Sequence, residues 1–310
     1  MSIDRIGTAA NAQFMLAQIQ KAEFALDTAN RQVATGKVAD TYSGYGDKTA
    51  VMEAARSTAA KIDANVATAK QAAARLDLQD TQLSQLGSLA DQVRQTLTKA
   101  AADQDATSLM DQMQGYFSQA VDILNAKDAN GYIYGGDNNQ TPPVTVDNLT
   151  DLAALPSVSN AFDNGNVKTS VRIGEGQTVQ VGLLASDLGT QLFSLFRQVA
   201  QFDAGGSGPF DTTTSGAQQN FLESTLPTAA TVADGVNQEM AGNGIRYQMT
   251  QDSLTRLQAT STVYKGLVSN IEDVDITQAL ANVNQNQIAL QAAFQVTSKL
   301  NQLSLLDFMQ

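Results

Sequence analysis

The chain of 310 residues contains no cysteine, no histidine and no tryptophan. Without cysteine there is no disulfide and no thiol nucleophile, and without histidine there is no imidazole to transfer protons near neutral pH. Most zinc and copper sites depend on the same two residue types. We therefore predict that the protein is not an enzyme, and that it has no catalytic residues, no cofactor and no metal site.

Aromatic residues are also scarce, at 6%, although hydrophobic residues together make up 43% of the chain. The apolar content is mostly small and aliphatic, which suits slim seams between helices better than a thick globular core. The net charge of −12 disfavours binding to nucleic acid or to an anionic membrane surface, because both are negatively charged. We expect no nucleic acid and no membrane among the partners.

Long apolar runs are missing as well. No segment approaches the roughly 18 consecutive apolar residues that a membrane-spanning helix requires. The first residues, Met1 to Arg5, do not form a basic segment followed by an apolar one, so no cleaved secretory signal is predicted. We expect a soluble chain, and any export would have to use another route.

Helical periodicity, by contrast, begins close to the N-terminus. Apolar residues recur there in alternating steps of three and four, the spacing of a coiled-coil stripe. Gly36 should end this helix, and the loop at 40–48 should separate it from a second, longer helix with a stripe over 62–100. A third helix is expected at 106–127. The first stripe consists of Ala12, Met15, Ile19, Ala22, Leu26, Ala29 and Val33.

The character of the sequence changes at Gly131. The segment GYIYGGDNNQTPPVTV, which begins there, contains a proline pair that no helix interior accommodates. Residues 169–184 alternate β-branched side chains around a glycine-rich turn, which is typical of a β-hairpin. We therefore predict a small β-rich outer domain at 131–185, inserted between helical parts of the chain.

Helix is expected again from Ser186 onward. One segment should end before Gly242-Asn243-Gly244 and another should begin after it, because glycines interrupt helices. The acidic run IEDVD (271–275) should break the helix once more. The last helix carries its own heptad stripe, formed by Ile276, Leu280, Val283, Leu290 and Phe294, with polar Gln287 and Thr297 in phase.

The acidic run could also suggest a calcium site. Glu272, Asp273 and Asp275 lack the alternating oxygen ligands, the glycine and the final glutamate of a helix–loop–helix calcium loop. A solvated break between helices is the simpler interpretation, with Asp275 as the N-cap of the last helix.

The two terminal stripes need partners, because an isolated amphipathic helix is marginal in water. They could cover each other in an antiparallel pair within one chain, contact neighbouring subunits, or do both. Their narrow, alanine-rich character and the 40–48 loop favour contacts between subunits. The predicted assembly interface comprises Met15, Ile19, Leu26, Val33, Ile276, Leu280, Val283, Leu290 and Phe294.

The predicted fold class is mainly α: an elongated, coiled-coil-like helical rod formed by the N- and C-terminal segments, with the small β-rich insertion. Three domains are expected. Residues 1–40 with 275–310 form terminal coiled-coil assembly segments, residues 41–130 with 186–274 form a helical rod domain, and residues 131–185 form the outer domain.

Three segments resemble the flagellin superfamily. Residues 271–309, IEDVDITQALANVNQNQIALQAAFQVTSKLNQLSLLDFM, are similar to its C-terminal helix and to the acidic break before that helix. LDTANRQVATGK (26–37) resembles the N-terminal helix and the glycine that ends it. AGNGIRYQM (241–249) is similar to the start of the long C-terminal core helix. Similarity at both ends, joined by a variable middle, is a specific pattern.

Within the superfamily, the chain most resembles hook-associated protein 3, the family of hook–filament junction proteins. The end of the chain, LQAAFQVTSKLNQLSLLDFM, lacks the Ala-Asn-Gln-x-Pro stretch of filament flagellins. ATGK (34–37) and GYIYGG…TPPV also resemble the junction proteins more closely. The 40–48 loop departs from the family pattern, because it lacks the Pro-Asp-Asp-Pro-like element that often follows the first helix.

This resemblance implies an extracellular structural subunit of the bacterial flagellum that joins hook to filament as an adaptor. It also implies export through the flagellar type III apparatus. The partners would be hook-associated protein 1, flagellin, further copies of the chain in a ring or tube, and an export chaperone on the C-terminal helix.

Three alternatives remain open from the sequence. The first is a flagellin paralogue that builds the filament itself. The second is a secreted enzyme or toxin on a helical scaffold, which would need carboxylates or a Ser/Lys pair, and no such constellation stands out. The third is a soluble helical signalling module, which would be a compact monomer with ordered termini.

Overall fold

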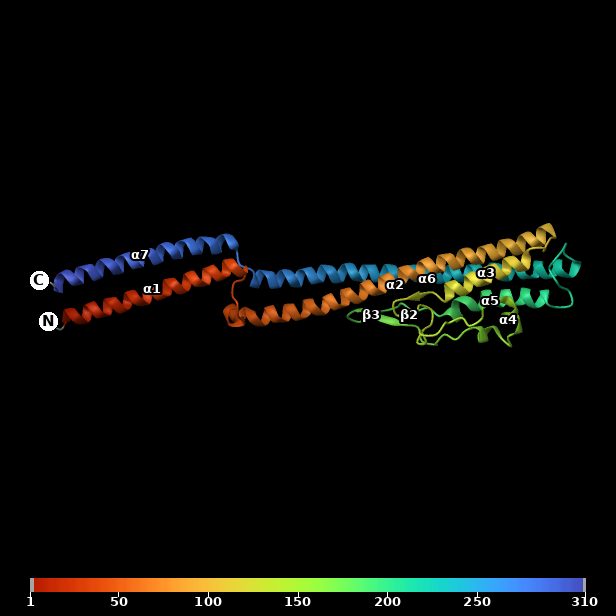
Figure 1. The fold of residues 1–310 in the computed structure, drawn as a ribbon, viewed down its shortest axis with the longest axis horizontal. Helices are drawn as coiled ribbons and strands as arrows, with labels where there is room; N and C mark the ends of the chain where they lie inside the picture. Colours follow the sequence, from red (N-terminus) through yellow and green to blue (C-terminus); the bar gives the residue numbers. More distant parts are fainter. Residues whose placement is uncertain (1–2, 309–310) are drawn as a thin grey trace. The chain divides into compact units, whose positions relative to one another are not determined.

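The computed structural model describes residues 3–308, and it describes side chains over residues 13–299. The fold is mainly α, as predicted. The chain forms two compact units: unit 1 contains the residues up to Lys61 and from Thr260 onward, and unit 2 contains Ile62–Ala259. Of the described helices, α2 (Thr49–Asp103) and α6 (Gly216–Glu272) contribute residues to both units (Figure 1).

Unit 1 is built around two long helices from the ends of the chain. Helices α1 (Ile3–Thr35) and α7 (Ile276–Phe308) pack side by side and run in opposite directions (Figure 1). α1 ends where predicted: Gly36 follows with a φ of +69°, a left-handed conformation that glycine adopts without the strain of a Cβ. The segment expected to be a loop contains a 3-10 helix, η1 (Tyr42–Lys48).

The acidic run interrupts the C-terminal helices as predicted. α6 ends at Glu272 and α7 begins at Ile276. Asp275 caps α7, because its Oδ1 accepts hydrogen bonds from the backbone N–H groups of Thr277 at 2.8 Å and Gln278 at 3.2 Å. These bonds satisfy donors of the first turn that have no partner within the helix.

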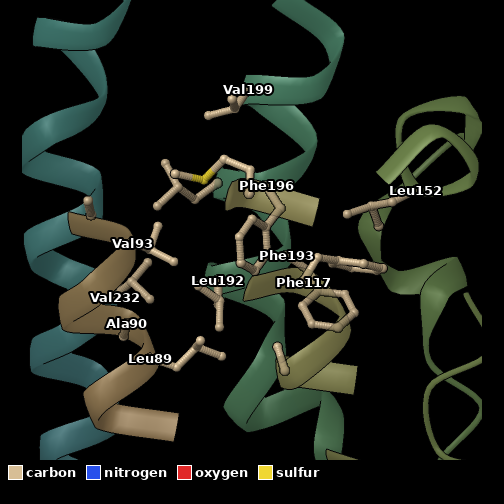
Figure 2. Packing of buried hydrophobic residues seen from close by; sticks show 14 of the residues in the cluster. Leu89, Ala90, Val93, Phe117, Leu152, Leu192, Phe193, Phe196, Val199 and Val232 are labelled. Carbon is tan, nitrogen blue, oxygen red and sulfur yellow. The ribbon is translucent and has the colours of Figure 1, made fainter. Parts of the chain in front are cut away.

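Unit 2 holds the main hydrophobic core. Residues from α2 and α6 pack there with α3 (Leu109–Leu124) and α5 (Ala185–Asp203). Three phenylalanines lie at its centre: the Phe117 ring centroid lies 5.0 Å from that of Phe193 and 5.7 Å from that of Phe196. Figure 2 shows these rings beside Val93 of α2 and Val232 of α6. This cluster of rings therefore stabilises unit 2.

The insertion between α3 and α5 contains two antiparallel two-stranded sheets. β1 (Lys127–Asp128) pairs with β2 (Gly131–Tyr132), and β3 (Ser170–Gly174) pairs with β4 (Gln177–Gln180). The second pair confirms the hairpin predicted at 169–184. Between the two sheets, the structure also has a short helix, α4 (Leu149–Ala154), and a 3-10 helix, η2 (Val158–Ala161).

One turn of α2 holds both hairpins against the helices of unit 2. A guanidinium nitrogen of Arg75 donates a hydrogen bond to the carbonyl of Ile133 at 3.0 Å, just after β2. The fully buried Gln79 donates its amide Nε2 to the carbonyl of Val181 at 2.9 Å, just after β4. The half-buried Arg75 and the buried Gln79 therefore pair with buried carbonyls that would otherwise have lost their hydrogen bonds with water.

The expected break at Gly242-Asn243-Gly244 is wrong, because α6 is one continuous helix from Gly216 to Glu272. Asn243 explains the difference. Its side chain is fully buried, and its amide donates a hydrogen bond to the carbonyl of Leu76 on α2 at 2.9 Å. Packing between helices thus outweighs the cost of the two glycines, which is about 1 kcal/mol each relative to alanine.

Candidate assembly interface

A narrow seam joins α1 to α7 in unit 1. On α1, the predicted residues Met15, Ile19, Leu26 and Val33 are all half-buried. Ala29, which lies in the same stripe, is 3% exposed. The side chain of Ala12, the first residue expected in this stripe, lies outside the described residues. The stripe predicted on α1 therefore faces inward within a single chain, where α7 packs against it.

On α7, the inward positions are displaced from part of the predicted stripe. Val283 and Leu290 are half-buried and belong to the seam. The positions between and beside them are small or polar, which is why the sequence pattern did not single them out. Among the described side chains, the inward stripe on α7 consists of Ala279, Asn282, Val283, Asn286, Leu290, Ala293 and Thr297.

The other three residues predicted on α7 lie outside this seam. Ile276, Leu280 and Phe294 expose 43%, 48% and 50% of their surface, respectively. α7 therefore has two adjacent apolar stripes, of which one packs against α1 and the other faces away. We call Ile276, Leu280 and Phe294 the outer stripe.

The exposed surface of this helix pair contains further large apolar side chains. Phe14 and Phe24 on α1 are 64% and 70% exposed, and Ile288 on α7 is 68% exposed. Residues 276–298 of α7 carry no charged side chain. A surface that is uncharged over this length and exposes several large apolar side chains is suited to burial against another protein surface.

The residues that follow α1 and those that precede α7 are joined by backbone hydrogen bonds. Lys37 and Asp273 form an antiparallel bridge. The N–H of Val38 donates to the carbonyl of Glu272 at 2.8 Å, and the N–H of Val274 donates to the carbonyl of Gly36 at 2.9 Å. The link that follows α1 and the link that precedes α7 therefore form one local structure.

The Glu272 side chain lies at the centre of this structure. The residue is 8% exposed, and one carboxylate oxygen, Oε1, lies 2.6 Å from Lys37 Nζ. The other oxygen accepts a hydrogen bond from the guanidinium of Arg56 on α2. Hydrogen bonds from Lys37 and Arg56 hold the pKa of Glu272 below its ordinary value, and the bond to Glu272 raises the pKa of Lys37. We call residues 36–38, Arg56 and residues 272–274 the linker clamp.

The other two acidic residues of the run 271–275 form hydrogen bonds that stabilise the local structure. Asp273 is hydrogen-bonded to the Ser269 hydroxyl, and Asp275 caps α7. Within the part of the chain that the structure describes, no group of three or more acidic residues is placed to hold a metal ion. None of the described helices is both long and apolar enough to cross a membrane.

Two family models match the chain at its two ends. The bacterial flagellin N-terminal helical region matches residues 6–133, and the bacterial flagellin C-terminal helical region matches residues 228–309. Together these matches cover more than half of the chain. The chain belongs to the flagellin family. Members of this family are structural proteins and not enzymes.

Solved structures show the same fold. A protein described as a flagellar hook-associated protein from Vibrio parahaemolyticus aligns with a TM-score of 0.56 at 16% identity, covering 71% of this chain and 93% of its own. FlgL from Bacillus cereus aligns with a TM-score of 0.54 at 14% identity. The alignment covers 70% of the present chain and 98% of the FlgL chain. No curated protein sequence matches the chain.

The linker clamp is the part of the site that the sequence did not predict. Glu272 was interpreted only as part of a solvated break, whereas its carboxylate is buried between two cations. Lys37 and Arg56 lie at the far end of the sequence from Glu272, and no local pattern connects them. Both flagellin matches include residues of the clamp, with Lys37 and Arg56 in the first and Glu272 in the second.

Proposed function

We propose that the protein joins the hook of the bacterial flagellum to its filament as an adaptor, and that it assembles through α1 and α7. The membership in the flagellin family supports a structural subunit of the flagellum. The observation that carries the proposed mode of assembly is the outer stripe, which stays exposed although α1 and α7 are already paired.

The pairing of α1 with α7 supports different partners for the two stripes on α7. The inward stripe packs against α1 within one chain, so the outer stripe and exposed residues such as Phe14 and Phe24 are the surface proposed to contact a neighbouring subunit. Complete burial of one Leu or Phe side chain stabilises by about 1.5–3 kcal/mol. Several half-exposed side chains per subunit, repeated around a ring or tube, would give strong association without a large contact at any one residue.

The adaptor role is supported by the resemblance to hook-associated proteins and by the two solved structures with the same fold. The proposed neighbours are hook-associated protein 1 on the hook side and flagellin on the filament side, together with further copies of the chain. We further propose an extracellular location, type III export and an export chaperone bound to the C-terminal helix. Residues 1–40 and 275–310 would form the inner part of the assembly, and residues 131–185 the outer domain on the helical rod.

A flagellin paralogue that builds the filament is the second candidate. Both family models that match describe flagellin itself, which favours this reading. Purified protein that polymerises alone into long tubes would support the paralogue. An adaptor should form at most short rings, and it should extend only on hook ends or in the presence of flagellin.

The adaptor proposal is tested by deleting the gene and examining the cells by electron microscopy, with an assay for flagellin in the medium. We expect bare hooks, with flagellin lost into the medium, and restored filaments when the wild-type gene is supplied. Attached filaments of near-normal length in the deletion strain would contradict the adaptor role.

A further inference from the structure

The seam between α1 and α7 contains little that would determine its register. In coiled coils, register is commonly set by ion pairs between helices and by polar residues that pair across the seam. α7 has no charged residue between Asp275 and Lys299, so no ion pair can form along that stretch. Among the described side chains, those of residues 13–35 form no hydrogen bond with those of 276–299.

The packing along the seam is also permissive. Its most buried positions are alanines, Ala29 on α1 and Ala279 on α7. A heptad stripe looks similar to itself after a shift of seven residues, which moves one helix past the other by about 10.5 Å. Small side chains leave few protrusions that would make such a shifted pairing clash.

The linker clamp supplies the missing constraint. Its backbone bridge fixes Lys37 beside Asp273, immediately beyond the ends of α1 and α7. The Glu272 carboxylate attaches this bridge to Arg56 of α2, and a charged hydrogen bond is stronger than a neutral one. Glu272 contacts both cations at once and precedes α7 by only three residues, so sliding α7 past α1 would strain its contact with Lys37, which follows α1.

We propose that Glu272 is the positioning residue that sets the register of α7 against α1, acting through Lys37 and Arg56. The importance of the register rests on the proposed function, because it determines where Leu280 and Phe294 stand relative to the exposed residues of α1. A shift of one heptad would leave the pair of helices intact but would present a different outer surface to a neighbouring subunit.

The absence of cysteine from the chain allows a direct test by disulfide cross-linking. From the clamp outward, the seam residues Val33, Ala29, Leu26 and Ala22 have the same four- and three-residue spacing as Ala279, Val283, Asn286 and Leu290. Matching the two series in order, we expect Ala22 to lie opposite Leu290. Ala22→Cys with Leu290→Cys reports the native register, and Ala22→Cys with Val283→Cys reports a shift of one heptad. Both pairs are made in the purified full-length chain, and their rates of disulfide formation are compared by mass spectrometry.

In the chain with Glu272, we expect the native pair to form much faster than the shifted pair. Glu272→Gln removes the negative charge that both Lys37 and Arg56 contact, and it should reduce this ratio by about tenfold or more. Lys37→Arg, which keeps the cation, should retain the ratio. Glu23→Gln, which removes an exposed carboxylate on α1, is the matched control and should leave it unchanged.

An unchanged ratio in Glu272→Gln would overturn the proposal. Equal slowing of both pairs would also overturn it, because it would show that Glu272 stabilises the helix pair without selecting its register. The assay needs no flagellar partner, so its failure would leave the adaptor role intact, and failure of the deletion experiment would leave the register result intact.

Discussion

Lys37 and Glu272 lie near opposite ends of the sequence, and their side chains meet with Nζ and Oε1 2.6 Å apart. The lysine follows the helix that opens the chain, and the glutamate is the last residue of α6. Arg56 contacts the same carboxylate from α2. A single buried carboxylate therefore connects the link after α1, the start of α2 and the link before α7.

This arrangement predicts a specific dependence of stability on pH. The pKa of Glu272 is lowered from an ordinary value of 4.5, so its contribution is present above that value and is lost as pH falls through the lower pKa of the folded state. The pKa of Lys37 is raised from 10.5, so its contribution is present below 10.5 and is lost as pH rises through the higher folded value.

The measurement compares urea unfolding of the wild type with that of Glu272→Gln across pH. We expect the wild type to be more stable between about pH 5 and pH 10, with the difference disappearing in stronger acid. A stability difference that persists unchanged at pH 2 would mean that charge on Glu272 is not its cause.

Substitution of the outer stripe should separate assembly from folding. Leu280→Gln replaces a half-exposed side chain, so the monomer should lose less than about 1 kcal/mol of stability, whereas affinity for a neighbouring subunit should fall at least tenfold. Circular dichroism measures the first effect and sedimentation of assembled protein the second. Gln287→Ala, at an exposed polar position of the same helix, should change neither. Loss of cooperative melting in Leu280→Gln would refute this separation.

The two classes of phenylalanine should behave differently. Phe193→Ala should destabilise unit 2 by about 3–5 kcal/mol, because its fully buried ring packs 5.0 Å from Phe117. Phe24→Ala removes a ring that is 70% exposed and should change monomer stability by only about 0.5 kcal/mol. Chemical denaturation of both variants checks the contrast. A large loss with Phe24→Ala would show that the ring already has a partner in the monomer.

Replacing each of two glycines by alanine should change the stability of the protein in opposite directions. A Cβ at Gly244 would meet no neighbouring atom, so Gly244→Ala should stabilise α6 by about 0.4–1 kcal/mol. Gly36 has a φ of +69°, so Gly36→Ala should destabilise the end of α1 by about 1 kcal/mol despite equally open space. Thermal melting distinguishes the two. A destabilised Gly244→Ala would indicate that the helix does not continue through this position.

The sequence was most informative where the relevant interactions are local. The end of α1 at Gly36, the cap at Asp275 and the β3–β4 hairpin depend on neighbours within a few residues, and each was predicted correctly. The continuity of α6 was not, because it depends on the contact of Asn243 with Leu76 in a distant part of the chain. The packing between α6 and α2 outweighs the low helix propensity of the two glycines.

In the candidate interface, too, local patterns were predicted from the sequence and long-range contacts were not. Periodicity identified the inward face of α1, but on α7 the larger side chains of Leu280 and Phe294 concealed an inner stripe made of smaller residues such as Ala279. Apolar periodicity weights large side chains, whereas a close helix pair prefers small ones. The clamp at Glu272 could not be predicted at all, since it requires the fold to bring the two ends of the chain together.

The outer stripe is the surface through which we propose that the adaptor assembles at the hook end. The most direct test of this proposal returns a Leu280→Gln, Phe294→Gln variant to the deletion strain and counts filaments on hooks by electron microscopy, with Gln287→Ala as the control. We expect bare hooks and flagellin in the medium for the double variant, although the protein is made and exported, and normal filaments for the control. Normal filaments on cells that carry the double variant would contradict it.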